Sequence, residues 1–215
     1  MAEKKRVFGG MEAAFDMLYL AFCLFLVVYL IAAPQNPQRQ FALWMALALG
    51  GGDAFHLIPR IATTLKRGDA SRFRVALGVG KFATSVTMTA FYVLLWHLGA
   101  SIIPGVHALW TDILYALAII RVALLLPSEN GWLLEKPPVK WGIIRNAPFA
   151  LMGVQVAVLF ACGGYASMAI AIALSFLFYI PVILFANEHP KVGMLMMPKT
   201  VMYVWILAMC AWTIH

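Results

Sequence analysis

Apolar residues form long runs along the chain, separated by short polar connections. A helix that crosses the hydrocarbon core of a bilayer needs about 20 predominantly apolar residues. Segments of this kind cover residues 14–33, 41–60, 75–96, 107–127, 143–163, 166–187 and 194–213. Their short connections favour sequential antiparallel packing. The pattern therefore predicts an all-α, polytopic integral membrane bundle of seven transmembrane helices, forming one domain over residues 1–215.

Composition agrees with this prediction, since 63% of the 215 residues are hydrophobic and 12% are charged. Soluble domains are roughly half apolar and about a quarter charged. A soluble fold of this size cannot bury so much apolar surface, so a bilayer is the solvent for most of the chain. The formal net charge of +7 then indicates contact with anionic membrane lipids, and no motif for nucleic-acid binding is present.

Basic residues are distributed unevenly between the two sides of the predicted spans. One side has Arg39 alone. The other carries Lys4, Lys5, Arg6, Lys66, Arg67, Arg72, Arg74, Lys136, Lys140 and Lys191. The positive-inside rule places the N-terminus in the cytoplasm and the C-terminus outside. The first apolar run follows "EKKR" but is longer than a signal-peptide core, so we expect a retained span in a multi-pass protein of the cell (inner or plasma) membrane.

Ionisable and polar groups recur in the cytoplasmic half of the spans. They are Asp16, Asp53, His56, Arg60, Lys81, Arg121, Arg145, Asn146, Glu188, His189 and Lys199. Arg60, Arg145 and Lys199 lie near helix ends, where long cationic side chains can reach the headgroups without any further role. Asp53, His56 and Lys81 are deeper or shorter and need a partner or water.

Helical spacing gathers these groups on common faces. In "GGGDAFHLIPR", Asp53, His56 and Arg60 stand at i, i+3 and i+7. Further stripes comprise Lys81, Ser85, Thr89 and Tyr92; Glu12, Asp16 and Tyr19; and Lys199 with Tyr203. Lipid would reject all of these stripes, so they predict a polar seam inside the bundle.

Helix-breaking residues stand beside the same charges. Glycines 50–52 precede Asp53, Gly78 and Gly80 precede Lys81, and prolines stand at 148, 181 and 198. Broken helices that line a binding cavity, as in transporters, are one interpretation. Kinks and close packing through small residues are the other. The sequence leaves both open.

Several chemistries lack the residues they require. A metal site needs three or four convergent ligands, and Asp53 with His56 supplies two, so no metal is expected. Ser85 and Ser175 lack a nucleophile motif, and no cofactor fingerprint occurs. Lys199 lies too close to a helix end for a retinal Schiff base. Cysteines 23, 162 and 210 stand in apolar runs and are expected to be packing or lipid-facing thiols.

Asp53 and His56 suit a general acid/base pair, although they serve equally well as inert partners of Arg60, Lys81 or Arg121. Cations outnumber acids in the predicted seam, which favours a small anionic or zwitterionic ligand. The expected ligand-binding residues are Arg60, Lys81, Arg121, Arg145, Asn146, Lys199, Tyr203, Asp16 and Glu188.

The segment "ALALGGGDAFHL" and, about two dozen residues later, "ALGVGKFATSVTMTAFYVLLWH" resemble a glycine–aspartate helix and the helix after it in the bacterial lysoplasmalogenase-like membrane family. The resemblance implies a small multi-span hydrolase of lysoplasmalogen lipids that uses membrane-embedded aspartates. Gly52 and Asp53 carry the motif. The family's later serine–aspartate motif is absent, since Thr111-Asp112 lies toward the other face, and seven spans replace the usual eight.

The sequence therefore favours a membrane-embedded, hydrolase-type enzyme acting on a lipid or lipid-like anionic substrate from the cytoplasmic leaflet. The alternative is a small transporter or ligand-binding sensor that uses the same cavity without chemistry. The sequence decides neither enzymatic activity nor whether the chain forms a homo-oligomer.

Overall fold

Seven long α-helices make up most of the computed structural model, which describes residues 2–34, 36–66, 70–134 and 136–212. They are α1 (Ala2–Ala32), α2 (Pro37–Lys66), α3 (Ala70–Ile102), α4 (Ala108–Leu125), α5 (Val139–Cys162), α6 (Ala166–Phe185) and α7 (Met196–Trp212). Short 3-10 helices follow α4 (η1, Ser128–Asn130) and precede α7 (η2, Pro190–Leu195). Each long helix is apolar enough to span a membrane, and the described residues contain no strand. The predicted all-α bundle of seven membrane helices is confirmed.

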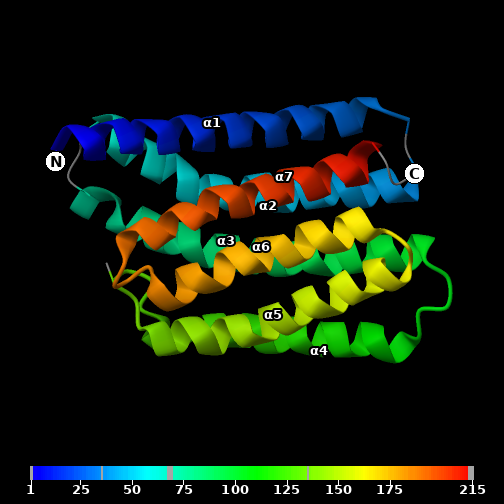
Figure 1. Cartoon of the computed structure of the whole chain (residues 1–215). Helices are drawn as coiled ribbons and strands as arrows, with labels where there is room; N and C mark the ends of the chain where they lie inside the picture. Colours follow the sequence, from blue (N-terminus) through cyan, green and yellow to red (C-terminus); the bar gives the residue numbers. More distant parts are fainter. Residues whose placement is uncertain (1, 35, 67–69, 135, 213–215) are drawn as a thin grey trace.

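Consecutive helices run antiparallel, and α7 returns to pack against α1, α2 and α6 (Figure 1). Helices α4 and α5 form the edge of the bundle opposite α1. The first residues of α1 and the last residues of α7 lie at opposite ends of the bundle. We call the end where α1, α3, α5 and α7 begin the α1 end.

The described basic residues keep the predicted asymmetry between the two ends. Arg74, Lys136, Lys140 and Lys191 lie at or near the α1 end, whereas Arg39 lies at the other. Of the remaining residues behind the predicted orientation, Arg67 lies outside the described residues. The side chains of Lys4, Lys5, Arg6, Lys66 and Arg72 are likewise outside the described part.

Large apolar side chains cover the outside of the bundle as well as filling its core. Leu26, Phe91 and Leu114 are fully buried, whereas Leu18 is 72% exposed and Ile119 70% exposed. Water would oppose so many exposed apolar side chains, but hydrocarbon does not. The distribution is that of a multi-pass membrane protein.

Two helix boundaries differ from the predicted ones in ways that affect the polar residues. Helix α2 continues past Arg60 to Lys66, and the hydroxyls of Thr63 and Thr64 donate to the Arg60 carbonyl oxygen at 2.7 and 3.0 Å. Arg60 therefore lies inside a helix rather than at its end. Helix α6 stops at Phe185 and a turn follows it, and His189, directly before Pro190, has the non-helical backbone that a following proline favours.

The glycines and prolines of the spans do not break them. Helix α2 is continuous through residues 50–52 and Pro59, α5 through Pro148, and α6 through Pro181. The interpretation of these residues as helix breaks is wrong, and close packing explains Gly50, Gly52, Gly78 and Gly80 instead. The hydroxyl of Thr84 on α3 donates to the Gly52 carbonyl oxygen at 3.0 Å, across the contact between α2 and α3.

Gly80 marks a close approach of the backbones of these two helices. A Cβ atom at Gly80 would overlap the Phe55 carbonyl oxygen and lie 2.7 Å from the His56 Cα. Both are backbone atoms of α2, which cannot move aside as a flexible side chain can. At Gly51, by contrast, a Cβ atom would meet nothing within 4 Å.

We predict that Gly80→Ala destabilises the protein and that Gly51→Ala does not. Overpacking at Gly80 should cost about 1–3 kcal/mol. At Gly51 the higher helix propensity of alanine should leave stability unchanged or raise it by up to about 1 kcal/mol. Thermal unfolding of both variants in detergent measures the difference. Equal melting temperatures for the two variants would contradict close packing at Gly80.

Candidate functional site

A small cavity, here called the polar cavity, lies between α1, α2, α3 and α7 and has a volume of about 80 Å³. One water needs about 10–15 Å³ by this measure, so the cavity holds a few waters. Its polar lining comprises Glu12, Asp16, Asp53, His56, Arg60, Thr84, Lys199, Thr200 and Tyr203. Its apolar lining comprises Phe15, Leu57, Met88, Met196 and Met197. Most of the stripes predicted from helical spacing thus meet here.

Asp53 is held by a hydrogen bond between α1 and α2. The Tyr19 hydroxyl donates to the Asp53 Oδ2 at 2.7 Å, and Tyr19 is almost fully buried. Gly50 permits the close approach of α1, since a Cβ atom there would lie 2.7 Å from the Cys23 Cβ. The bond fixes the carboxylate while leaving its other oxygen free of Tyr19. Lys199 of α7, 8% exposed, lines the same cavity and supplies a positive charge.

Arg60 pairs with carboxylates of α1 instead of reaching for headgroups. Its Nη2 forms an ion pair with the Glu12 Oε1, and its Nη1 lies 3.8 Å from the Asp16 Oδ2. The side chains of Glu12 and Arg60 are 28% and 30% exposed, whereas that of Asp16 is 8% exposed. The positive charge of Arg60 is therefore compensated by two carboxylates, the partly exposed Glu12 and the buried Asp16. Arg60 is therefore not a cation near a helix end whose only role is to reach the headgroups.

His56 contributes an imidazole whose Nδ1 is buried and makes no hydrogen bond within the described part of the chain. It stands one helical turn after Asp53 on the same face of α2 and lines the polar cavity. The ring thus borders the space that can hold water, while its Nδ1 atom is enclosed by protein.

A second polar group, the Arg121 cluster, lies between α4, α5, α6 and α7. It consists of Arg121, Asn146, Phe149, Tyr179 and Lys199. The Asn146 Oδ1 accepts from the Tyr179 hydroxyl at 3.1 Å and from the Arg121 Nη1 at 3.5 Å. The Arg121 guanidinium stacks on Phe149, with its Cζ 3.5 Å from the ring centroid. The Lys199 Nζ lies 4.0 Å from the Tyr179 ring centroid, so Lys199 joins this cluster to the polar cavity.

The structure divides the predicted site residues into three sets. Asp16, Asp53, His56, Arg60, Lys199 and Tyr203 meet at the polar cavity. Arg121 and Asn146 belong to the Arg121 cluster. Lys81, Arg145 and Glu188 lie outside both groups.

Each of these three outlying residues has a different setting. The Ser85 hydroxyl donates to the Lys81 carbonyl oxygen at 2.8 Å, so part of the polar stripe on α3 is satisfied within its own helix. The Arg145 Nη1 donates to the Asn130 Oδ1 at 3.0 Å. Glu188 is exposed in the turn after α6.

Some residues of the two groups were not among the expected site residues. Glu12 and Tyr19 share the helical spacing of Asp16, and this spacing was the signal that could have included them. Phe149 and Tyr179 carry no such signal, since an aromatic residue in an apolar span is equally compatible with contact to lipid. No group of three or more His, Cys, Asp or Glu residues able to hold a metal ion occurs among the described residues.

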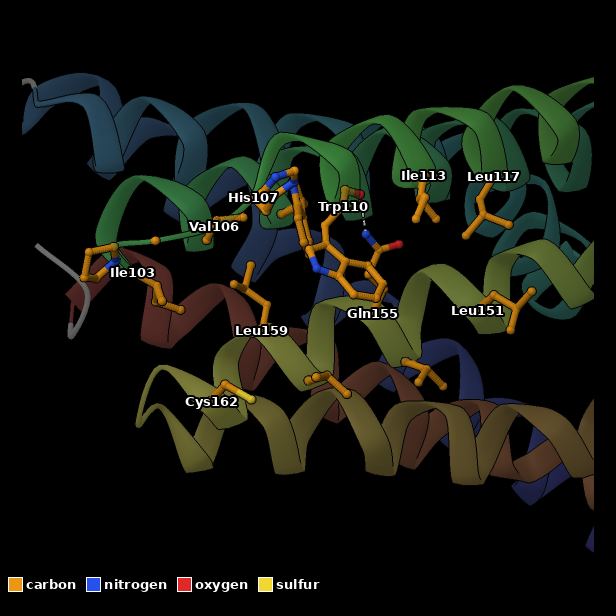
Figure 2. A pocket seen from close by; sticks show the side chains of 15 residues that line it. Ile103, Val106, His107, Trp110, Ile113, Leu117, Leu151, Gln155, Leu159 and Cys162 are labelled. Carbon is orange, nitrogen blue, oxygen red and sulfur yellow. Dashed lines mark hydrogen bonds between the residues drawn. The ribbon is translucent and has the colours of Figure 1, made fainter.

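A larger cavity of about 670 Å³ lies between α4, α5 and the end of α3 (Figure 2). Its lining is mainly apolar, with His107 and Gln155 as polar exceptions, and the Gln155 Nε2 donates to the Trp110 carbonyl oxygen. Its lining includes no Asp, Glu, Lys or Arg. Because it lacks paired acid, base and cation, we assign the candidate site to the polar cavity despite its smaller volume.

We predict that Tyr19→Phe destabilises the protein by about 1–2 kcal/mol, because a partly buried carboxylate loses its donor while the ring stays in place. The matched control is Tyr29→Phe. Tyr29 stacks on Phe25 and contacts Trp212, and no hydrogen bond of its hydroxyl is present in the described part. Thermal unfolding in detergent compares the two. An equal loss for both variants would show that the Tyr19–Asp53 bond contributes nothing specific.

In comparisons with known proteins, no protein-family model, no curated protein and no solved structure matches the chain. The resemblance around Gly52 and Asp53 therefore stays a prediction, and function has to be argued from the polar cavity itself.

Proposed function

We propose that the protein is a membrane-embedded hydrolase whose active site is the polar cavity and whose substrate is a lipid or lipid-like anion. One observation carries the proposal. A carboxylate, an imidazole, an ammonium and a guanidinium line one cavity with room for water. Hydrolysis needs a water, a group that takes its proton, and positive charge where the oxyanion develops.

The roles follow from the contacts. The His56 imidazole takes a proton from a bound water as the water oxygen attacks the electrophilic centre of the substrate. Lys199 and Arg60 stabilise the negative charge that develops. The bond to the leaving oxygen then breaks, and His56 returns the proton to that oxygen. Asp53, fixed by Tyr19, stabilises the imidazolium from one helical turn away.

The apolar lining supports an amphiphilic substrate. Phe15, Met88, Met196 and Met197 face the same cavity as the charged groups. Methionine side chains are flexible and adapt to irregular apolar shapes. A substrate could place its reacting polar group among the charges and its hydrocarbon chain along these residues.

Hydrolysis is better supported than transport. Transporters commonly bind substrate where membrane helices are interrupted. Helix α2 runs without a break past Asp53, His56 and Arg60, which places the candidate catalytic side chains on a rigid element. Rigid placement suits catalysis, because reacting groups must be held in a narrow range of geometry.

We further infer that the α1 end faces the cytoplasm and that the bundle resides in the cell membrane. The excess of basic residues at that end supports this orientation. Substrate would then enter from the cytoplasmic leaflet.

We predict that Asp53→Asn and His56→Ala each lower kcat by at least about 10²-fold, the usual contribution of a general acid or base. The assay incubates purified protein in nanodiscs with a panel of lysophospholipids and lysoplasmalogens and detects released products by mass spectrometry. Asp112→Asn and His189→Ala are matched controls, because both residues are exposed and lie outside the cavity. Both controls should keep wild-type turnover.

Two results would oppose the hydrolase proposal. One is the absence of turnover by the wild-type protein on every member of the panel. The other is turnover that persists in both cavity variants. Binding without turnover, altered by Asp53→Asn, would instead favour the transporter or sensor alternative.

The orientation is testable through the native cysteines. Cys162 is exposed at the end of α5 opposite the α1 end, whereas Cys23 and Cys210 are buried. A membrane-impermeant maleimide should label Cys162 on intact cells. In a Cys162→Ser background, Lys140→Cys at the start of α5 should react only after permeabilisation. The reverse pattern would invert the inferred topology.

A further inference from the structure

The cavity between α4, α5 and the end of α3 has the size and the apolar lining of a ligand-binding site (Figure 2). Its volume is about 670 Å³, and ligand pockets commonly measure about 300–1,000 Å³. Its described lining includes no Asp, Glu, Lys or Arg. A charged group inside it would have no partner of opposite charge, so the cavity suits a hydrocarbon chain with an uncharged polar group.

Hydrogen bonds between helices fix the walls of this cavity. Trp96 of α3 is 2% exposed, and its Nε1 donates to the Thr111 Oγ1 of α4 at 3.1 Å. The Gln155 Nε2 of α5 donates to the Trp110 carbonyl oxygen of α4, and Figure 2 shows both side chains between these two helices. Because the bonds join α4 to both of its neighbours, the cavity is preformed rather than opened by a ligand.

The cavity opens sideways, toward lipid. Helices α4 and α5 form one edge of the bundle, and both are apolar enough to span a membrane. Leu151, Val154 and Val158 of α5 line the cavity and are each more than half exposed. Hydrocarbon surrounds such a span, so a ligand can enter from the bilayer without passing through water.

The length of the cavity matches one leaflet of a bilayer. It runs from His107, directly before α4, to Leu117 near the middle of that helix. Along the antiparallel α5 it runs from Cys162, the last residue, to Leu151. Figure 2 shows His107 and Cys162 toward one end and Leu117 and Leu151 toward the other. About ten helical residues rise about 15 Å, which is half of a hydrocarbon core of about 30 Å.

Two N–H donors lie toward the end of the cavity where α4 begins. The His107 Nδ1 accepts from the Leu109 backbone N–H at 3.2 Å, so the neutral ring carries its hydrogen on Nε2. Trp110 is 53% exposed, and tryptophan favours the membrane interface. Neither the His107 Nε2 nor the Trp110 Nε1 has a hydrogen-bond partner among the described residues. The ester carbonyls of bilayer lipids lie at this depth and are uncharged acceptors.

We propose that this cavity binds one diacyl glycerolipid from the leaflet at the end opposite the α1 end. One acyl chain lies along Ile113, Leu117 and Leu151, and its ester carbonyl accepts from Trp110 and His107. The headgroup stays outside the cavity, at the membrane interface. This site is separate from the polar cavity and does not depend on the hydrolysis proposed there, so either proposal can fail without the other.

Native mass spectrometry of the delipidated full chain in detergent, titrated with dioleoyl phosphatidylcholine, tests the site. One lipid should bind more tightly than any further ones. Val154→Trp should raise the Kd of that lipid at least about tenfold, because the indole takes up the space of the chain. Equal Kd values for the wild type and Val154→Trp would overturn the proposal.

Val28→Trp is the matched control. Val28 of α1 and Val154 are the same residue type, both are 60% exposed, and Val28 lies outside the cavity. The control variant should bind the lipid as tightly as the wild type does. A loss of binding equal to that of Val154→Trp would show that the lipid is not held in this cavity.

The carbonyl contact is tested with the diether analogue of the same phosphatidylcholine. The wild type should bind the diester about three- to tenfold more tightly, as expected for one or two hydrogen bonds to an uncharged acceptor. Trp110→Phe keeps an aromatic ring but removes the N–H, so it should reduce this preference. Equal affinities of the wild type for diester and diether would overturn the assignment of Trp110 and His107.

A direct measurement covers the case in which Val154→Trp fails to fold. Wild-type protein in nanodiscs is photolysed with a phosphatidylcholine that carries a diazirine near the end of one acyl chain. Cross-links should concentrate on the peptides around Leu117 and Leu151. Labelling spread evenly over the lipid-facing residues of α1, α4, α5 and α6 would overturn the proposal, since the cavity would then hold only exchanging bulk lipid.

Discussion

The contact of Arg60 with two carboxylates of α1 sets the arrangement of the helices around the polar cavity. Helix α2 carries Asp53, His56 and Arg60 on one face, and hydrocarbon cannot solvate that face. Helix α1 supplies Glu12 and Asp16 to the guanidinium and Tyr19 to the aspartate. These contacts fix the register of α1 against α2 over about two turns. Helix α7 then closes the cavity with Lys199.

The bundle accommodates the cations of its helices in two different ways. At the polar cavity, Arg60 meets carboxylates, which compensate its charge while leaving a water-sized space between the helices. At the Arg121 cluster, the cations meet aromatic faces and one amide oxygen, in a densely packed setting. The first arrangement suits proton transfer, because acid, base and water share one space. The Arg121 cluster is positively charged but too densely packed to admit a substrate. The two regions therefore have different roles, although Lys199 belongs to both.

The sequence was sufficient to predict the helices and much of the polar cavity. Hydrophobic runs long enough to span a bilayer leave few alternatives, and helical spacing correctly grouped Asp53, His56 and Arg60 on one face. It could not separate Arg121 from that face, because the depth of a residue in the membrane does not specify which neighbouring helix its side chain meets. The glycines were ambiguous for a similar reason. Gly80 is required by the backbone of α2 at Phe55 and His56, a contact between residues far apart in sequence.

The small volume of the polar cavity constrains how a lipid could react there. About 80 Å³ admits water and little else, so a reacting ester or ether group requires one wall to move. Helix α2 is a poor candidate for that movement, because it is continuous and packs against α3 with backbone in contact at Gly80. The wall formed by Met196 and Met197 differs, since α7 begins there directly after the short helix η2. Rotation of methionine side chains at a helix start requires no loss of buried hydrogen bonds, so opening on this side would leave Asp53, His56 and Arg60 in place while the substrate enters.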